Sequence, residues 1–152
     1  MINHASKCFF VNGPDGIRKT FLYNTLLANI ISCGKIALAV ASSRITTLLI
    51  TGGRTAHSWF KILIKLEPSS TCNISQRSKE THLINVAKLI IWDEALMIYK
   101  FTFEAVNRTF RDITQIDEPF EQKTFVFEGN FYQVLPVISH FSHADIVSAS
   151  LN

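Results

Sequence analysis

Apolar and polar residues follow one another in blocks along the chain, and the block lengths distinguish strands from helices. Four short apolar runs predict buried strands at 7–12, 35–41, 88–92 and 123–127. These runs are apolar throughout instead of alternating with polar residues. That pattern is typical of a parallel sheet that is covered on both faces.

Longer stretches between these runs have helical spacing. Residues 19–33 predict a helix that Gly34 ends, and residues 99–113 predict a second one. A short helix is expected at 43–50, and a last helix could start within 144–151. The serine- and threonine-rich residues 61–82, with Pro68, predict a surface excursion. The apolar face expected on the first helix consists of Phe21, Leu22, Leu26, Leu27, Ile30 and Ile31.

Strands that alternate with helices indicate βαβ units, so the predicted fold class is α/β, a mainly parallel sheet flanked by helices on both faces.

The 152 residues fit one domain, 1–152. An apolar fraction of 47% supplies a core, and 18% charged residues argue against wholesale disorder. No apolar run reaches 18 residues, so no membrane span is expected, and no signal peptide is visible in residues 1–7. The three cysteines are widely spaced and predict reduced thiols. The net charge of +3 is compatible with nucleic acid without demonstrating it.

The strongest chemical signal lies between the first strand and the first helix, in the stretch GPDGIRKT at 13–20. A strand, a glycine-containing turn and then Lys19-Thr20 at the start of a helix are the context of a phosphate-binding loop of the Walker A type. Backbone N–H groups would hold phosphate oxygens, Lys19 would contact the β and γ phosphates, and Thr20 would ligate Mg²⁺. The second glycine of this motif is Arg18 here, and the same octapeptide could be an ordinary turn before a helix. If the position needs a positive φ, a non-glycine residue costs about 1–2 kcal/mol.

A phosphate loop of this kind needs a distant carboxylate at the end of an apolar strand, and Asp93-Glu94 follows such a strand. Asp93 would orient Mg²⁺ and Glu94 would polarise the attacking water. A GTPase would carry D-x-x-G here, which is absent. The acidic pair also favours an ATPase that hydrolyses its nucleotide over a kinase of small substrates.

A further stretch, 54–61, combines charge with aromatic rings. Arg54 and His57 could contact phosphates, and Trp59 and Phe60 could stack on bases. Both rings could equally be part of the core.

These motifs together resemble the first motor domain of the petite-integration-frequency (PIF) family of superfamily-one DNA helicases, including helicase segments of plant Helitron-type elements. The resemblance covers essentially the whole chain. It rests on the segments FFVNGP at 9–14, FLYN at 21–24, AVASS at 39–43, GGRTAHS at 52–58, IWDEA at 91–95 and QVLPV at 133–137.

The resemblance implies a RecA-like P-loop fold and ATP-driven, Mg²⁺-dependent unwinding of DNA with 5′ to 3′ polarity, in repair, recombination and telomere maintenance. The implied partner is single-stranded or forked DNA, and the implied location is the nucleus. It assigns catalytic roles to Lys19, Glu94 and Gln133, the last as a sensor of the γ-phosphate, and metal binding to Thr20 and Asp93. It assigns DNA binding to Arg54, Thr55 and His57. The residues that it places around ATP are Gly13, Pro14, Gly16, Lys19 and Thr20.

Several positions depart from the family pattern. Arg18 and Asp15 replace glycines of the loop, and Arg44, Thr46 and Thr47 replace the small residues of the second motif. In the fourth-strand motif, Glu128, Asn130 and Tyr132 stand where the family has Gly, Asp and Arg.

A helicase of this class also needs a second motor domain, for which 152 residues leave no room. The expected protein is therefore a truncated first motor domain with weak or lost ATPase activity. The alternative is a non-catalytic remnant that binds nucleic acid or a protein.

Overall fold

The computed structural model describes residues 7–13, 18–117 and 123–130. Its centre is one sheet of five strands in the order β1-β5-β4-β2-β3, and each neighbouring pair runs parallel. The predicted parallel α/β sheet is therefore confirmed. The strands are β1 (Lys7–Asn12), β2 (Ile36–Ala41), β3 (Arg54–Thr55), β4 (Ala87–Asp93) and β5 (Thr124–Gly129).

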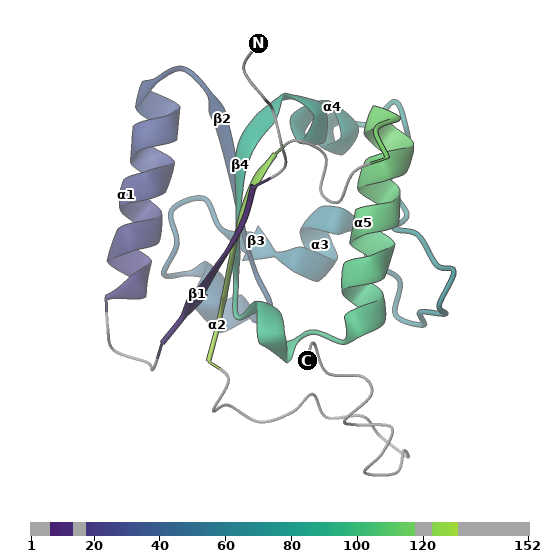
Figure 1. Ribbon diagram of the computed structural model, residues 1–152, viewed down its shortest axis with the longest axis horizontal. Coiled ribbons are helices and arrows are strands. Elements are labelled where there is room, and N and C mark those ends of the chain that lie inside the picture. Colours follow the sequence, from purple (N-terminus) through teal and green to yellow (C-terminus); the bar gives the residue numbers. More distant parts are fainter. Residues whose placement is uncertain (1–6, 14–17, 118–122, 131–152) are drawn as a thin grey trace.

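Helices cover both faces of this sheet. Figure 1 shows α1 on one side and α3, α4 and α5 on the other, which gives the three layers of the predicted fold. No helix in the described part of the chain is long and apolar enough to cross a bilayer. The helices are α1 (Lys19–Ser32), α2 (Arg44–Thr47), α3 (Ala56–Phe60), α4 (Lys79–Val86) and α5 (Lys100–Thr114), with a 3-10 turn at Ala95–Met97.

The central strand β4 divides the core between the two faces. Leu89 and Ile91 belong to the cluster on the α1 side, and Ile90 and Trp92 belong to the larger cluster beneath α5. The indole of Trp92 stacks on Phe103 of α5 with ring centroids 4.6 Å apart. Because both faces of β4 are packed, its sequence is apolar at consecutive positions.

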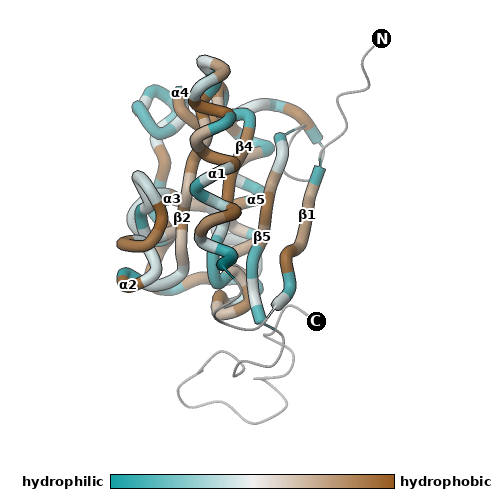
Figure 2. The backbone as a smooth tube through the Cα atoms, turned by 90° about the vertical axis from the view of Figure 1, so that its left-hand side faces the viewer, coloured by the Kyte–Doolittle hydropathy of each residue, from teal (hydrophilic) through white to brown (hydrophobic). Residues whose placement is uncertain are grey.

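The burial predicted for the first strand is wrong. Among the described strands β1 pairs with β5 alone, and it is the outermost strand of the sheet, next to β5 in Figure 2. Phe9 and Phe10 are therefore 53% and 42% exposed. An apolar run of this length predicts a strand correctly, but it cannot tell whether a second neighbour and a covering helix are present.

The apolar face predicted for the first helix is also partly wrong. Tyr23 and Leu27 are the buried residues of α1, with Leu26 and Ile30 packed beside them. These four positions follow the i, i+3, i+4, i+7 spacing of a helical stripe. Phe21, Leu22 and Ile31 lie outside this stripe and are 72%, 44% and 57% exposed.

The helix end was placed correctly. Gly34 follows α1 with a φ of +70°, and its N–H donates to the carbonyl of Ile31 over 2.9 Å. A glycine reaches this left-handed conformation without a steric cost.

Short helices were the least predictable elements. The helix expected at 43–50 is limited to α2, while α3 was not predicted and α4 begins inside the supposed surface excursion. Each of these helices starts at a hydroxyl residue whose side chain accepts a backbone N–H, namely Ser43, Thr55 and Ser78. Such N-caps are a sequence signal, although a weak one without an apolar stripe behind them. The helix considered within 144–151 lies outside the described residues.

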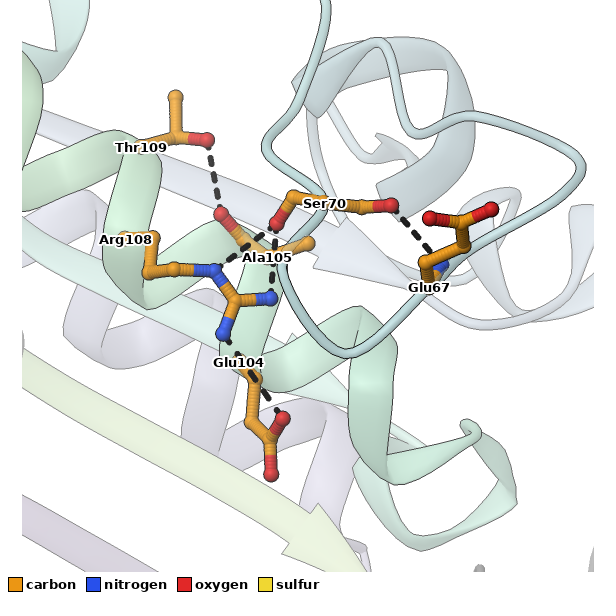
Figure 3. A network of polar contacts seen from close by, with 6 residues as sticks. All are labelled: Glu67, Ser70, Glu104, Ala105, Arg108 and Thr109. Carbon is orange, nitrogen blue, oxygen red and sulfur yellow. Dashed lines mark hydrogen bonds and ion pairs between the residues drawn. The ribbon is translucent and has the colours of Figure 1, made fainter.

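The rest of the excursion is fixed to α5 by polar contacts (Figure 3). Arg108 donates from Nε and Nη2 to the carbonyl of Ser70 over 2.9 and 2.7 Å. The backbone N–H of Cys72 donates to the Thr109 hydroxyl over 2.8 Å. Cys72 itself is buried against the core. The segment therefore packs on α5 at Arg108 and Thr109.

Candidate nucleotide site

A pocket of about 550 Å³ opens at the carboxyl ends of the parallel strands, where α1 begins. Ligands of open parallel sheets bind at this edge because the loops that follow the strands converge there. The pocket is lined by Arg18, Lys19, Thr20, Ser43, Ile45, Thr46, Leu49, Asp93, Glu94 and Glu128. Four residues predicted from two distant motifs, Lys19, Thr20, Asp93 and Glu94, therefore share one cavity.

Arg18 stands immediately before α1 with φ 53° and ψ 27°, in the left-handed region. The position does need a positive φ, as the missing glycine suggested. Its carbonyl accepts from the N–H groups of Phe21 and Leu22, which starts the helix. The other loop residues assigned to the nucleotide, Pro14 and Gly16, lie outside the described residues.

Lys19 is held by two acceptors. Its ammonium donates to the carbonyl of Gly13 over 2.7 Å and forms an ion pair with the Glu128 carboxylate. Only 12% of the Lys19 side chain is exposed, and 5% of the Glu128 side chain. The lysine that should contact phosphates therefore already has an anionic partner.

Glu128 also contacts the acidic pair. Its second oxygen, Oε2, accepts the backbone N–H of Glu94 over 3.0 Å. Burial, together with the hydrogen bond and negative charge of Glu128 and the charge of Glu94, raises the pKa of Asp93 to about 7. Asp93 and Glu128 thus form a close pair of buried carboxyl groups beside Lys19.

Glu94 is positioned by the end of β2 and by α2. The Thr46 hydroxyl donates to its carboxylate Oε2 over 2.7 Å, and the Ser42 hydroxyl donates to its carbonyl over 2.6 Å. Glu94 itself adopts a φ of 54° as the chain turns out of β4. The carboxylate is therefore fixed at the pocket wall by a residue that replaces a small one of the family pattern.

The stretch assigned to DNA is only partly available for it. Arg54 and His57 are exposed, whereas Trp59 and Phe60 are buried in the core beneath the sheet. The Thr55 hydroxyl caps α3 by accepting the N–H of Ser58 over 3.3 Å. The interpretation of both rings as core is confirmed. Gln133, the predicted γ-phosphate sensor, lies outside the described residues.

The residues at this edge fit Mg²⁺ and a polyphosphate in part. Thr20 and Asp93 are oxygen donors on the wall of one pocket, as hard cations require, and Lys19 supplies a cation. Glu128 fits less well, because its carboxylate would repel phosphate oxygens at the same lysine.

Sequence reasoning did not identify the contacts of Glu128 and Thr46. In the sequence, both residues stand out only as departures from a family pattern. One signal was available in the sequence. A glutamate replaces glycine near the end of the last predicted strand, and the carboxyl ends of parallel strands share one edge of the sheet with the phosphate loop. Its pairing with Lys19, 109 positions away, depends on β1 and β5 lying side by side.

Comparisons with known proteins agree with this geometry. The family model described as PIF1-like helicase matches residues 1–152. The ATP-dependent DNA helicase Pif1 of Campylobacter jejuni is 32% identical over 139 residues, which cover 85% of this chain and 29% of that protein. The helicase RRM3 of Saccharomyces cerevisiae is 26% identical over 137 residues, covering 88% of this chain and 19% of the relative.

Solved structures show the same fold. Bacteroides Pif1 bound to single-stranded DNA superimposes with a TM-score of 0.76 at 27% identity, over 93% of this chain and 32% of that one. Bacteroides Pif1 in complex with ADP-AlF3 and single-stranded DNA gives a TM-score of 0.77 at 24% identity, over 97% of this chain and 33% of that one. The chain thus spans between about one fifth and one third of the length of these relatives. With the family model matched from end to end and the phosphate-loop lysine beside the acidic pair, this chain belongs to the PIF1-like helicase family.

Proposed function

We propose that this chain is a first motor domain of an ATP-dependent DNA helicase, and that its pocket binds the phosphates of a nucleotide through Lys19. The supporting observation is that Lys19, Thr20, Asp93 and Glu94 line one cavity at the carboxyl edge of the sheet. Lys19 would carry the phosphate contact, Thr20 and Asp93 would hold Mg²⁺, and Glu94 would orient and polarise water. Bound Mg²⁺ supplies charge neutralisation at the phosphates.

Unwinding is proposed for a larger assembly. The matched relatives are several times longer than the chain, which leaves room in them for the second motor domain that the family resemblance implies. A second motor domain would supply the missing part of the DNA path. The 5′ to 3′ polarity, the roles in repair, recombination and telomere maintenance, and a nuclear location are extensions of the family resemblance. The yeast relative supports the nuclear location, whereas the bacterial relatives come from organisms without a nucleus.

Equilibrium binding of nucleotide tests the site directly. Titration calorimetry with ADP and with a non-hydrolysable ATP analogue, each with Mg²⁺, should show binding that Lys19→Ala weakens at least tenfold. Lys79→Ala, which removes an exposed lysine at the start of α4, is the matched control and should bind like the wild type. Equal binding by Lys19→Ala and the wild type would contradict the phosphate-loop assignment.

A second function, a non-catalytic nucleic-acid binding module, is favoured by one observation: Lys19 is already paired with Glu128. This alternative predicts affinity for single-stranded DNA that falls steeply with salt and does not depend on nucleotide. Fluorescence anisotropy with a labelled oligothymidine measures it. Arg54→Ala should weaken that binding, because Arg54 is an exposed cation of the stretch that resembles the DNA-contacting motif.

A further inference from the structure

Glu128 occupies a place in the pocket that an anionic ligand would be expected to take. One oxygen of its carboxylate pairs with the ammonium of Lys19, and the other accepts the backbone N–H of Glu94 over 3.0 Å. A lysine ammonium and a backbone N–H are also the donors that phosphate oxygens use in phosphate loops. The side chain of Glu128 therefore occupies a lysine ammonium and a backbone N–H, the two kinds of donor that bind phosphate oxygens.

The location of Glu128 indicates which phosphate this is. Phosphate-loop lysines contact the β and γ phosphates. Glu128 lies between Lys19 and the acidic pair, and the acidic pair belongs to the metal and water side of such a site, where the terminal phosphate ends. The carboxylate therefore stands on the γ side of Lys19.

We propose that Glu128 determines nucleotide specificity by holding the γ-phosphate position, so that this site accepts a nucleoside diphosphate in preference to a triphosphate. The inference rests on the proposed nucleotide-binding function and names its ligand class. The glutamate is only 4% exposed and emerges from the last strand of the described sheet, so it cannot move away without breaking its contacts to Lys19 and Glu94. A diphosphate ends before this position, whereas a triphosphate brings further negative charge onto it.

The size of the effect follows from Coulomb's law. Two like charges about 6 Å apart at an effective dielectric constant of about 20 change an affinity roughly one hundredfold, and salt reduces this toward about tenfold. Because Glu128 also withdraws Lys19 from a diphosphate, the ratio of the two affinities is the informative quantity.

The test compares three variants with the wild type by titration calorimetry, using ADP and the β,γ-imido analogue of ATP, both with Mg²⁺. Glu128→Gly removes the side chain, and Glu128→Gln keeps its shape without the charge. Glu104→Gln removes one negative charge from the exposed face of α5, outside the pocket, and is the control. Far-ultraviolet circular dichroism and the fluorescence of the two buried tryptophans, Trp59 and Trp92, report whether each variant is folded.

The wild type and Glu104→Gln should bind ADP more tightly than the analogue. Glu128→Gly should shift the affinity ratio toward the analogue at least tenfold, and Glu128→Gln should shift it in the same direction by less. A ratio within twofold of the wild type in both folded Glu128 variants, with binding that still requires Lys19, would overturn this proposal alone. Absence of binding in every protein, or binding that Lys19→Ala leaves unchanged, would overturn the proposed function as well.

Discussion

At the scale of single residues, two non-glycine residues beside the pocket adopt left-handed backbone conformations. Arg18 has a φ of 53° and Glu94 a φ of 54°, and they flank Lys19 and Asp93 respectively. A side chain with a Cβ is strained in this region by about 1 kcal/mol or more. Strain of this kind persists where the surrounding structure fixes the backbone, here at the start of α1 and at the end of β4.

Replacing Arg18 with glycine should therefore stabilise the domain. The expected gain in the free energy of unfolding is about 1 kcal/mol, because glycine reaches a φ of 53° freely. Urea denaturation followed by circular dichroism measures it. The control is Arg44→Gly, where the same side chain is lost from the helical backbone of α2, and this change should destabilise by about 1 kcal/mol. A loss of stability in Arg18→Gly would show that the left-handed backbone is not strained.

Tyr23 permits a second test at this scale. Its hydroxyl is buried and has no hydrogen-bond partner among the described residues. Burial, followed by the charges of Glu128 and Asp93, raises the pKa of this phenol far above its usual range. Since a buried hydroxyl without a partner keeps its desolvation cost, Tyr23→Phe should be neutral or stabilising by up to about 1 kcal/mol. Thermal unfolding of the two proteins measures the difference, and a clear loss of stability would reveal a partner of the hydroxyl.

At the scale of elements, the segment between α3 and α4 depends on a few side-chain contacts to stay on α5. Arg108 makes two hydrogen bonds to the Ser70 carbonyl, and its pair with Glu104 is a longer contact of 3.8 Å on the surface. Charged donors to a carbonyl stabilise more than an exposed ion pair does. The bonds to Ser70, not the ion pair, should therefore hold the segment.

Arg108→Ala should destabilise the domain by about 1–3 kcal/mol, whereas Glu104→Ala should change its stability by less than about 0.5 kcal/mol. Urea denaturation gives both numbers. Limited proteolysis should also cut Arg108→Ala sooner within 61–78, because the contacts that fix this segment are lost. Equal effects of the two substitutions would mean that the exposed ion pair is the dominant contact.

At the scale of the whole molecule, the fold separates the three cysteines by burial. Cys8 and Cys33 are exposed, and Cys72, which belongs to the segment packed on α5, is buried in the core. Burial raises the pKa of the Cys72 thiol to about 11, partly offset by the hydrogen bond to Thr109 and the charge of Arg108. The fold therefore favours the neutral thiol at this position.

Cys33 should react quickly with Ellman's reagent at pH 8, and Cys8 should react more slowly because partial burial raises the pKa of its thiol. Cys72 should react only when the protein unfolds in urea. The folded state favours neutral Cys72, so its contribution to stability is complete below about pH 9 and is lost as the pH rises toward about 11. Urea denaturation between pH 8 and 10.5 should show a decline that Cys72→Ala reduces. Rapid reaction of three thiols in the folded protein would contradict the burial of Cys72.

Sequence patterns predicted the longer elements and much of the pocket. Four apolar runs and two helical stripes gave strands and helices within a few residues of their observed ends, because local periodicity reflects which faces are buried. Lys19 and Asp93 could be assigned to one site because a loop after one strand and a carboxylate after another meet at the same edge of a parallel sheet. The short helix α3 and the start of α4 were not predicted, because one or two turns of helix show little periodicity in the sequence. The stability of such short helices comes from packing.

The sequence by itself determined the α/β class, the family resemblance and the residue types of the phosphate loop and acidic pair, since these are encoded in contiguous runs of the chain. Only the tertiary structure decided that Phe9 lies at an exposed edge, that Trp59 and Phe60 are core, and that Glu128 pairs with Lys19. These outcomes depend on the order of strands in the sheet. That order brings together residues such as Lys19 and Glu128, which are more than a hundred positions apart. A local sequence pattern cannot predict such a contact.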